Sequence, residues 1–205
     1  MNIANLYRKI KQILNDSNAA LANKGLNMVT SLNEIPNEIL KLGSINQLPY
    51  LLRKEIIEVT ENDLVGVTKI GQGVFLQCDN LTSVIIPNSV TSIDEQAFRL
   101  CNNLANITIP EGVESIGVSA FESCKGLIEV DIPISAITIG AYAFASCDNL
   151  TNIYLKPSTP PTLGNTYAIP SHTTIHVPVG RGDVYKSATN WSVFSDRIVE
   201  DIVLE

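Results

Sequence analysis

Residues 93–110 read IDEQAFRLCNNLANITIP, and this stretch decides the fold because the chain repeats its pattern. The pattern occurs four times, and one constant step separates successive copies of its Phe, Cys and Leu positions. A constant step of this kind is the signature of a solenoid in which each repeat forms one coil. The repeated residues are Phe75, Phe98, Phe121 and Phe144; Cys78, Cys101, Cys124 and Cys147; and Leu81, Leu104, Leu127 and Leu150.

Each repeat predicts two short strands joined by turns. Stretches such as Val90-Thr91-Ser92-Ile93 and Asn106-Ile107-Thr108-Ile109 alternate inward apolar and outward polar side chains, which is the period of a strand. The intervening segment around Ala97-Phe98 predicts a turn of helix that places the Phe ring in the core. One coil cannot bury its own apolar face, so we expect the coils to stack at about 4.8 Å. A left-handed turn is expected directly before each repeated Leu, where Asn and Gly tolerate positive φ: Asn80, Asn103, Gly126 and Asn149.

The repeat I-G-x-x-A-F-x-x-C-x-N-L-x-x-I-x-I-P resembles the BspA-like leucine-rich repeat family over residues 67–157. Asp94 departs from the usual Gly and Val74 from the usual Ala. The segments 174–180 and 185–191 resemble the C-terminal cap of that family. The resemblance implies a binding protein of a bacterial surface or a host contact. We expect Tyr185, Trp191 and Phe194 to cover the open end of the core.

The predicted fold is therefore an α/β solenoid, a leucine-rich repeat array of short parallel strands and short helical turns. A small helical segment precedes the array and a cap follows it. The predicted divisions are an attachment or assembly segment, a connector with the entry to the first coil, four 23-residue repeats and a C-terminal cap. Their bounds are 1–44, 45–66, 67–157 and 158–205.

The N-terminal segment has two interpretations. Its apolar residues between positions 2 and 23 recur at helical spacing, and a second short helix is expected from Pro36 to Leu42. The segment either caps the first coil or associates with other chains. The order of these elements, with Ile56-Ile57-Glu58-Val59-Thr60 leading into the repeats, resembles tail-associated proteins of phages and prophages. That resemblance implies homo-oligomer formation or virion assembly through residues 1–44.

Charge and hydropathy restrict the partners and the location. Residues 59–205 hold seven Lys and Arg against sixteen Asp and Glu, a net charge of −9, which argues against binding nucleic acid. No stretch approaches the roughly 20 apolar residues that span a bilayer, so we expect no membrane insertion. Arg8, Lys9 and Lys11 interrupt the apolar positions that a secretory signal needs. We expect synthesis in a host cytoplasm and residence in a virion; the alternative location is a bacterial cell surface.

The residues that carry chemistry predict no catalysis. The four Cys share one repeat position without a C-x-x-C pair, which predicts buried free thiols rather than zinc ligands or disulfides. His172 and His176 lack accompanying carboxylates or thiolates, so no metal and no cofactor is expected. No nucleophile, phosphate-loop or metalloprotease motif occurs. Arg181-Gly182-Asp183 spells a tripeptide that integrins bind, but it lies in a variable turn of the cap. The protein is not expected to be an enzyme.

The outward positions of one strand in each repeat are the candidate contact surface. Their side chains alternate with the core residues and form two parallel columns. We interpret the chain as a non-enzymatic binding or structural protein, a tail-associated virion component that contacts a protein or a host surface. The alternative is a bacterial BspA-like adhesin or host-interaction protein with a protein or cell-surface glycan partner. The columns are Ser83, Asn106, Glu129 and Asn152, and Ile85, Thr108, Asp131 and Tyr154.

Overall fold

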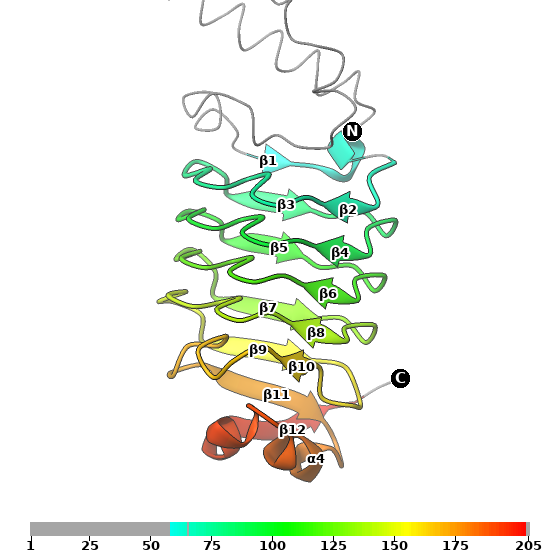
Figure 1. Ribbon diagram of the computed structural model, residues 1–205, viewed down its shortest axis with the longest axis vertical. Helices are drawn as coiled ribbons and strands as arrows, with labels where there is room; N and C mark the ends of the chain where they lie inside the picture. The colour runs from blue at the N-terminus through cyan, green and yellow to red at the C-terminus, as the bar shows by residue number, and fades with distance from the viewer. Residues whose placement is uncertain (1–57, 65, 204–205) are drawn as a thin grey trace, which may run out of the picture.

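The computed structural model describes residues 58–64 and 66–203, and these form a stack of coils built from parallel strands (Figure 1). One side of the stack carries the first strand of each coil, in two sheets. The three-stranded sheet has the order β1-β3-β5, and the four-stranded sheet has the order β12-β11-β9-β7. The strands are β1 (Glu58–Val59), β3 (Ser83–Ile85), β5 (Asn106–Thr108), β7 (Glu129–Ile132), β9 (Asn152–Leu155), β11 (Thr174–Pro178) and β12 (Ile198–Ile202).

The opposite side carries the second strand of each coil in one five-stranded parallel sheet of order β10-β8-β6-β4-β2. Residues one repeat apart face each other, as Ile70 faces Ile93 and Ile93 faces Ile116. The 23-residue step is therefore also the register of β2, β4, β6 and β8, whereas β10 pairs with β8 at a step of 24 residues. The predicted parallel solenoid is confirmed. The strands are β2 (Lys69–Ile70), β4 (Ser92–Ile93), β6 (Ser115–Ile116), β8 (Thr138–Ile139) and β10 (Thr162–Leu163).

The connection from the second strand to the next first strand differs from the prediction. Within the repeats at 67–157 it consists of successive turns without a helix, in which Arg99 N–H donates to Gln96 C=O (3.1 Å) and Cys101 N–H donates to Phe98 C=O (3.1 Å). The predicted left-handed turn before the repeated Leu is wrong. Positive φ occurs earlier, in the columns of Gln96 (57°) and Leu100 (62°).

The Asn before the repeated Leu instead makes a hydrogen bond to the preceding coil. The Asn103 side-chain amide donates to the carbonyl of Asp79 in the preceding coil (2.7 Å), and Asn149 donates in the same way to the carbonyl of Lys125 (2.8 Å). Asn at this position therefore joins coils instead of accommodating a strained backbone.

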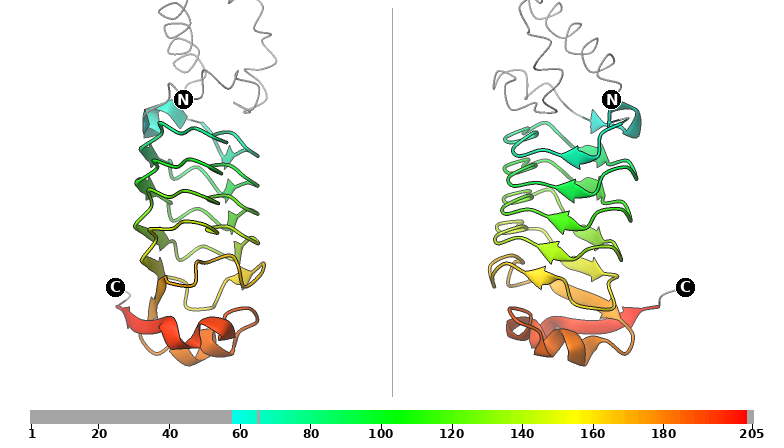
Figure 2. Two further views of the ribbon diagram at one scale, coloured as in Figure 1. Left: turned by 90° about the vertical axis from the view of Figure 1, so that its left-hand side faces the viewer. Right: turned by 45° about the vertical axis from the view of Figure 1, so that its right-hand side comes forward.

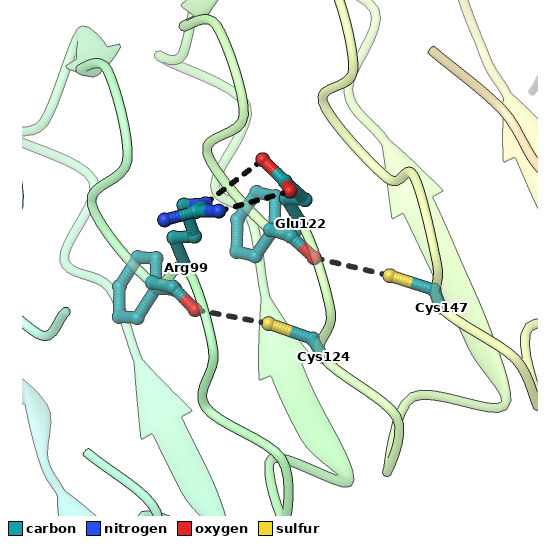
Figure 3. Close-up of polar contacts among 6 residues, drawn as sticks. Arg99, Glu122, Cys124 and Cys147 are labelled. Atoms are coloured by element: carbon teal, nitrogen blue, oxygen red, sulfur yellow. Dashed lines mark hydrogen bonds and ion pairs between the residues drawn. The ribbon is translucent and has the colours of Figure 1, made fainter. Parts of the chain in front are cut away.

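The Phe and Cys columns form the centre of the core. Phe75, Phe98, Phe121 and Phe144 are buried and stack face to face, with ring centroids 5.0, 5.2 and 5.2 Å apart. All four Cys are buried and none is in a disulfide, as predicted. Cys124 Sγ donates to the carbonyl of Phe98 (3.1 Å) and Cys147 Sγ to that of Phe121 (3.0 Å), as Figure 3 shows.

The glycine that follows the second strand lies in close contact with the backbone of the preceding coil at Gly117, Gly140 and Gly164. A β-carbon on Gly140 would lie 2.5 Å from the carbonyl carbon of Gly117, the equivalent residue of the preceding coil. A β-carbon on Gly117 would lie equally close to the backbone of Asp94. Coils therefore approach each other closely at this column, which explains why Gly recurs there.

The C-terminal cap closes one end of the stack (Figure 2). It contains β11, a short helix α4 (Gly182–Ser187), a 3-10 helix η4 (Ser192–Arg197) and β12, which adds to β11 in parallel. Tyr185, Trp191 and Phe194 are buried, as predicted. The Tyr185 hydroxyl donates to Pro157 C=O (2.7 Å), and Trp191 Nε1–H donates to Pro161 C=O (2.7 Å).

Near the other end, a 3-10 helix η3 (Glu61–Leu64) follows β1. The predictions for the segment 1–44, including its helices and its assembly role, lie outside the described residues. Over the part of the chain that the structure does describe, no helix has the length and apolar character needed to cross a bilayer.

Candidate binding surface

The eight predicted contact residues lie on the outward face of β3, β5, β7 and β9. Alternation along each strand places them there, because the residues between them, such as Val84 and Val130, are buried. The structure joins the eight in two groups of four. Ser83 faces Asn106 and Ile85 faces Thr108 across β3 and β5. Glu129 faces Asn152 and Asp131 faces Tyr154 across β7 and β9.

The two groups are separated by a break in the strand pairing. β5 ends one sheet and β7 begins the other, although the two strands are neighbours in the stack. Ile107, which the repeat assigns to the core, is only half-buried beside this break. The columns are therefore continuous in sequence pattern and interrupted in backbone hydrogen bonding.

The two groups differ in chemistry. On the β3–β5 side, Ile85 is 47% exposed beside the neutral Thr108. On the β7–β9 side, Glu129 and Asp131 are exposed, and Lys156 Nζ lies 3.4 Å from Asp131 and 3.6 Å from Glu111. One cation among these three carboxylates leaves the β7–β9 side negatively charged.

His176 continues the second column on β11 and was not among the eight predicted contact residues. It faces Tyr154 across β11 and β9, and the two rings stack with centroids 4.4 Å apart. His176 Nδ1 lies 2.7 Å from Asp201 Oδ2, and Nε2 lies 3.1 Å from Asn152 Oδ1. Partial burial, reinforced by Glu129, Asp201 and Asp131, raises the pKa of Tyr154.

A signal for His176 was present in the sequence. The cap segment Thr174-Ile175-His176-Val177-Pro178 repeats the alternation and the closing Pro of the repeats. Aligning Ile175-His176-Val177-Pro178 with Val130-Asp131-Ile132-Pro133 places His176 in the column of Asp131 and Tyr154, although it follows Tyr154 by 22 residues and not 23. The imidazole ring of His176 therefore lies on the outward face of the solenoid, where the Asp201 carboxylate and the Asn152 side-chain amide contact its two nitrogens.

The other residues singled out by the sequence do not assemble into a site. His172 precedes β11 and is exposed, so it does not share a strand with His176. Among the described residues, no group of three His, Cys, Asp or Glu side chains has the arrangement of a metal site. Burial raises the pKa of Cys147 to about 12, which opposes thiolate chemistry. Gly182 and Asp183 of the Arg-Gly-Asp tripeptide form the first turn of α4, and Gly182 is buried.

The fold and its outward columns define a leucine-rich repeat protein. The family model described as BspA type Leucine rich repeat region matches residues 68–178 in six copies. The chain belongs to the BspA-type leucine-rich repeat family. The match continues past residue 157 and includes β10 and β11, so the repeat pattern extends into the C-terminal region.

Several solved structures share this fold. A leucine-rich repeat protein of T. pallidum is 30% identical, with a TM-score of 0.55 over 61% of this chain and 60% of that protein. A leucine-rich cell surface protein of Faecalibacterium prausnitzii is 26% identical, with a TM-score of 0.55 over 73% of this chain and 36% of that protein. The pneumococcal vaccine antigen PcpA is 15% identical with a TM-score of 0.53, over 74% of this chain and 42% of that protein, and shows the fold alone. A comparison with curated proteins finds no significant match.

Proposed function

We propose that the protein is a non-enzymatic binding module that contacts a protein partner through the outward columns of β3, β5, β7, β9 and β11. The observation that carries this proposal is the contrast between the two faces of each strand. The inward residues repeat from coil to coil, whereas the outward residues change from neutral to acidic and aromatic along the stack. Leucine-rich repeats generally mediate protein interaction, and repeat proteins bind through columns of this kind.

We place this binding module at a cell surface. The support is the likeness to the F. prausnitzii protein, whose name describes a cell surface location. This chain covers less than two thirds of both that protein and the T. pallidum protein, so the activity of a whole relative enters only as part of this proposal. The role as a tail-associated virion component stays a prediction. Its support is the N-terminal resemblance, most of which lies outside the described residues.

The experiment compares charge reversal on the two faces of the solenoid. Fluorescently labelled full chain is incubated with epithelial cells and with bacterial cells, and binding is measured by flow cytometry. The Glu129→Lys/Asp131→Lys variant is expected to lose most binding, because it inverts the charge of the β7–β9 side. The Glu114→Lys/Glu95→Lys variant is the control, because both residues are exposed and flank second strands on the opposite side of the stack.

Two outcomes would contradict the proposal. A control variant that loses as much binding as the test variant would indicate nonspecific charge attraction and contradict the proposal. Binding to neither cell type would also contradict it. Binding to bacterial cells alone would favour the virion prediction over attachment to a host cell.

A further inference from the structure

Two tyrosines form an exposed aromatic pair in the turns that follow the second strands β8 and β10, outside the outward columns. Tyr142 follows β8, and Tyr167 occupies the equivalent position one coil later, because Phe144 N–H donates to Ala168 C=O as Phe121 N–H donates to Ala143 C=O. The two rings stack with centroids 5.9 Å apart and planes 11° apart. Tyr142 is 44% exposed and Tyr167 is 67% exposed. These rings therefore present aromatic surface to water.

The backbone conformation at position 142 is unfavourable for a tyrosine. Its φ is 59°, in the left-handed region, where a bulky side chain is disfavoured. Earlier coils place Gly73, Gln96 and Ser119 in this column, also with positive φ. The positive φ therefore belongs to the column as a whole, and among these four residues an exposed aromatic ring occurs only at Tyr142.

One side chain bridges the backbones of the two tyrosines. Asn165 Oδ1 accepts hydrogen bonds from the backbone N–H of Tyr142 (3.3 Å) and of Tyr167 (3.1 Å). This bridge sets the spacing of the two residues before any ligand arrives. A backbone that is already held in one arrangement gives up little conformational entropy on binding.

Polar groups lie beside the same column on the two coils before Tyr142. Arg99 donates to both carboxylate oxygens of Glu122, from Nε at 2.9 Å and from Nη2 at 3.2 Å (Figure 3). The hydrogen bond from Arg99 is the main cause that lowers the pKa of the Glu122 carboxyl, and a hydrogen bond from Ser119 adds to it against the effect of partial burial. Ser119 precedes Tyr142 in the column. The Arg99–Glu122 pair compensates its own charge, so it adds no net charge to the surface before Tyr142.

We propose that Tyr142 and Tyr167 are the stacking platform of a binding site for a neutral carbohydrate, with the Arg99–Glu122 pair on the two preceding coils to hydrogen-bond the sugar hydroxyls. The face of an aromatic ring is negative and attracts the polarised C–H groups on the apolar face of a pyranose. Planar polar side chains next to an apolar surface fix the orientation of such a ligand. The compensated charge favours neutral hexoses and N-acetylhexosamines over sialylated or sulfated sugars.

The size of the surface separates a sugar from a protein. Two aromatic side chains bury at most about 500 Å² together, because each buries about 150–250 Å² when fully covered. A stable protein interface buries about 800 Å² on each partner. The rings are therefore large enough for one or two sugar units and too small to hold a protein by themselves. This site rests on the proposed function only in that both treat the solenoid as a binding module.

The test uses the labelled full chain on an array of immobilised neutral oligosaccharides built from hexoses and N-acetylhexosamines, with sialylated and sulfated oligosaccharides in the same array. At least one neutral oligosaccharide is expected to bind. The Tyr142→Ser/Tyr167→Ser variant is expected to lower the affinity for it about tenfold or more, because both stacking contacts are lost. Val193→Ser, an exposed apolar residue of the cap outside both surfaces, is the control and is expected to stay within about twofold.

The serine variants suit this position, because Ser119 already occupies the column with positive φ. Circular dichroism melting checks that they fold, and Tyr142→Gly is the second variant, since Gly accepts this φ without strain. No binding to any neutral oligosaccharide, binding to charged ones only, or equal binding by wild type and the tyrosine variants would each overturn the proposal. Loss of cell binding by the tyrosine variants without oligosaccharide binding would assign the rings to a protein partner instead. The Glu129→Lys/Asp131→Lys variant distinguishes this failure from failure of the proposed function, because it alters only the columns.

Discussion

Replacing Phe121 with Ala tests the central claim that stacked rings hold the coils together. Phe121 is fully buried, and its ring lies 5.2 Å from both Phe98 and Phe144 at interplanar angles of 3° and 6°. Emptying a buried Phe site costs about 3–5 kcal/mol. Each aromatic contact contributes about 0.5–1.5 kcal/mol beyond the buried area. Loss of two such contacts places Phe121→Ala in the upper part of this range, at about 4–5 kcal/mol.

Phe75 supplies a matched comparison. It is equally buried but stacks on one described ring, Phe98, at 5.0 Å. We therefore expect Phe75→Ala to destabilise the protein by about 1 kcal/mol less than Phe121→Ala, since one ring contact is lost instead of two. The two variants differ in the number of described ring neighbours, so their difference reports on the stacking contribution.

The assay is thermal unfolding followed by circular dichroism, with urea unfolding to obtain free energies. For a chain of this size, about 1 kcal/mol lowers Tm by about 2–4 °C, so Phe121→Ala is expected to lower Tm by about 8 to 20 °C. A fall of only about 2 °C, well below the range worked from the same relation, would refute the assignment of the ring to a packed core. Equal effects of Phe75→Ala and Phe121→Ala would refute the contribution assigned to stacking.

Three further expectations concern other features of the chain. The four Cys of the native protein are expected to resist alkylation by iodoacetamide at pH 8, because all four are buried and burial raises the pKa of Cys101, Cys124 and Cys147. Mass spectrometry in denaturant should then show four modified thiols, and rapid native labelling would contradict their burial. Gly140→Ala is expected to destabilise the fold by about 1–3 kcal/mol in urea unfolding, since its β-carbon would meet backbone at 2.5 Å; an unchanged midpoint would show that the coils can separate there. Light scattering is expected to show association of the full chain and a monomeric fragment beginning at Ile56, and a monomeric full chain at high concentration would reduce residues 1–44 to a cap.

The repeat made most of the fold predictable. A core position that recurs once in every repeat must stack on its own copies, so Phe98 over Phe75 and Ile116 beside Ile93 follow from spacing alone. The outward placement of Glu129 and Tyr154 follows from strand alternation in the same way. These predictions depend on periodicity, which the sequence displays directly.

The features that the sequence did not predict depend on local hydrogen bonding. Asn103 tolerates positive φ, and nothing in its spacing shows that its amide instead reaches the carbonyl of Asp79. The break between β5 and β7 arises from backbone alignment, which the repeat pattern does not record. Tyr142 and Tyr167 are separated by slightly more than one repeat, so the pair appears only when the longer turn before Tyr167 brings it back into the column.

The contacts between neighbouring coils have a consequence for how the length of this protein can change. Each interior coil presents the same Phe, Cys and Leu positions to the coil before it and to the coil after it. A duplicated copy of the repeat unit between Pro110 and Pro133 would therefore dock beside its original with both of its surfaces already matched. Each such duplication would lengthen the rod by about 4.8 Å and add one residue to every outward column. Gene duplication can in this way adjust the reach of the molecule in equal steps while both of its ends stay unchanged.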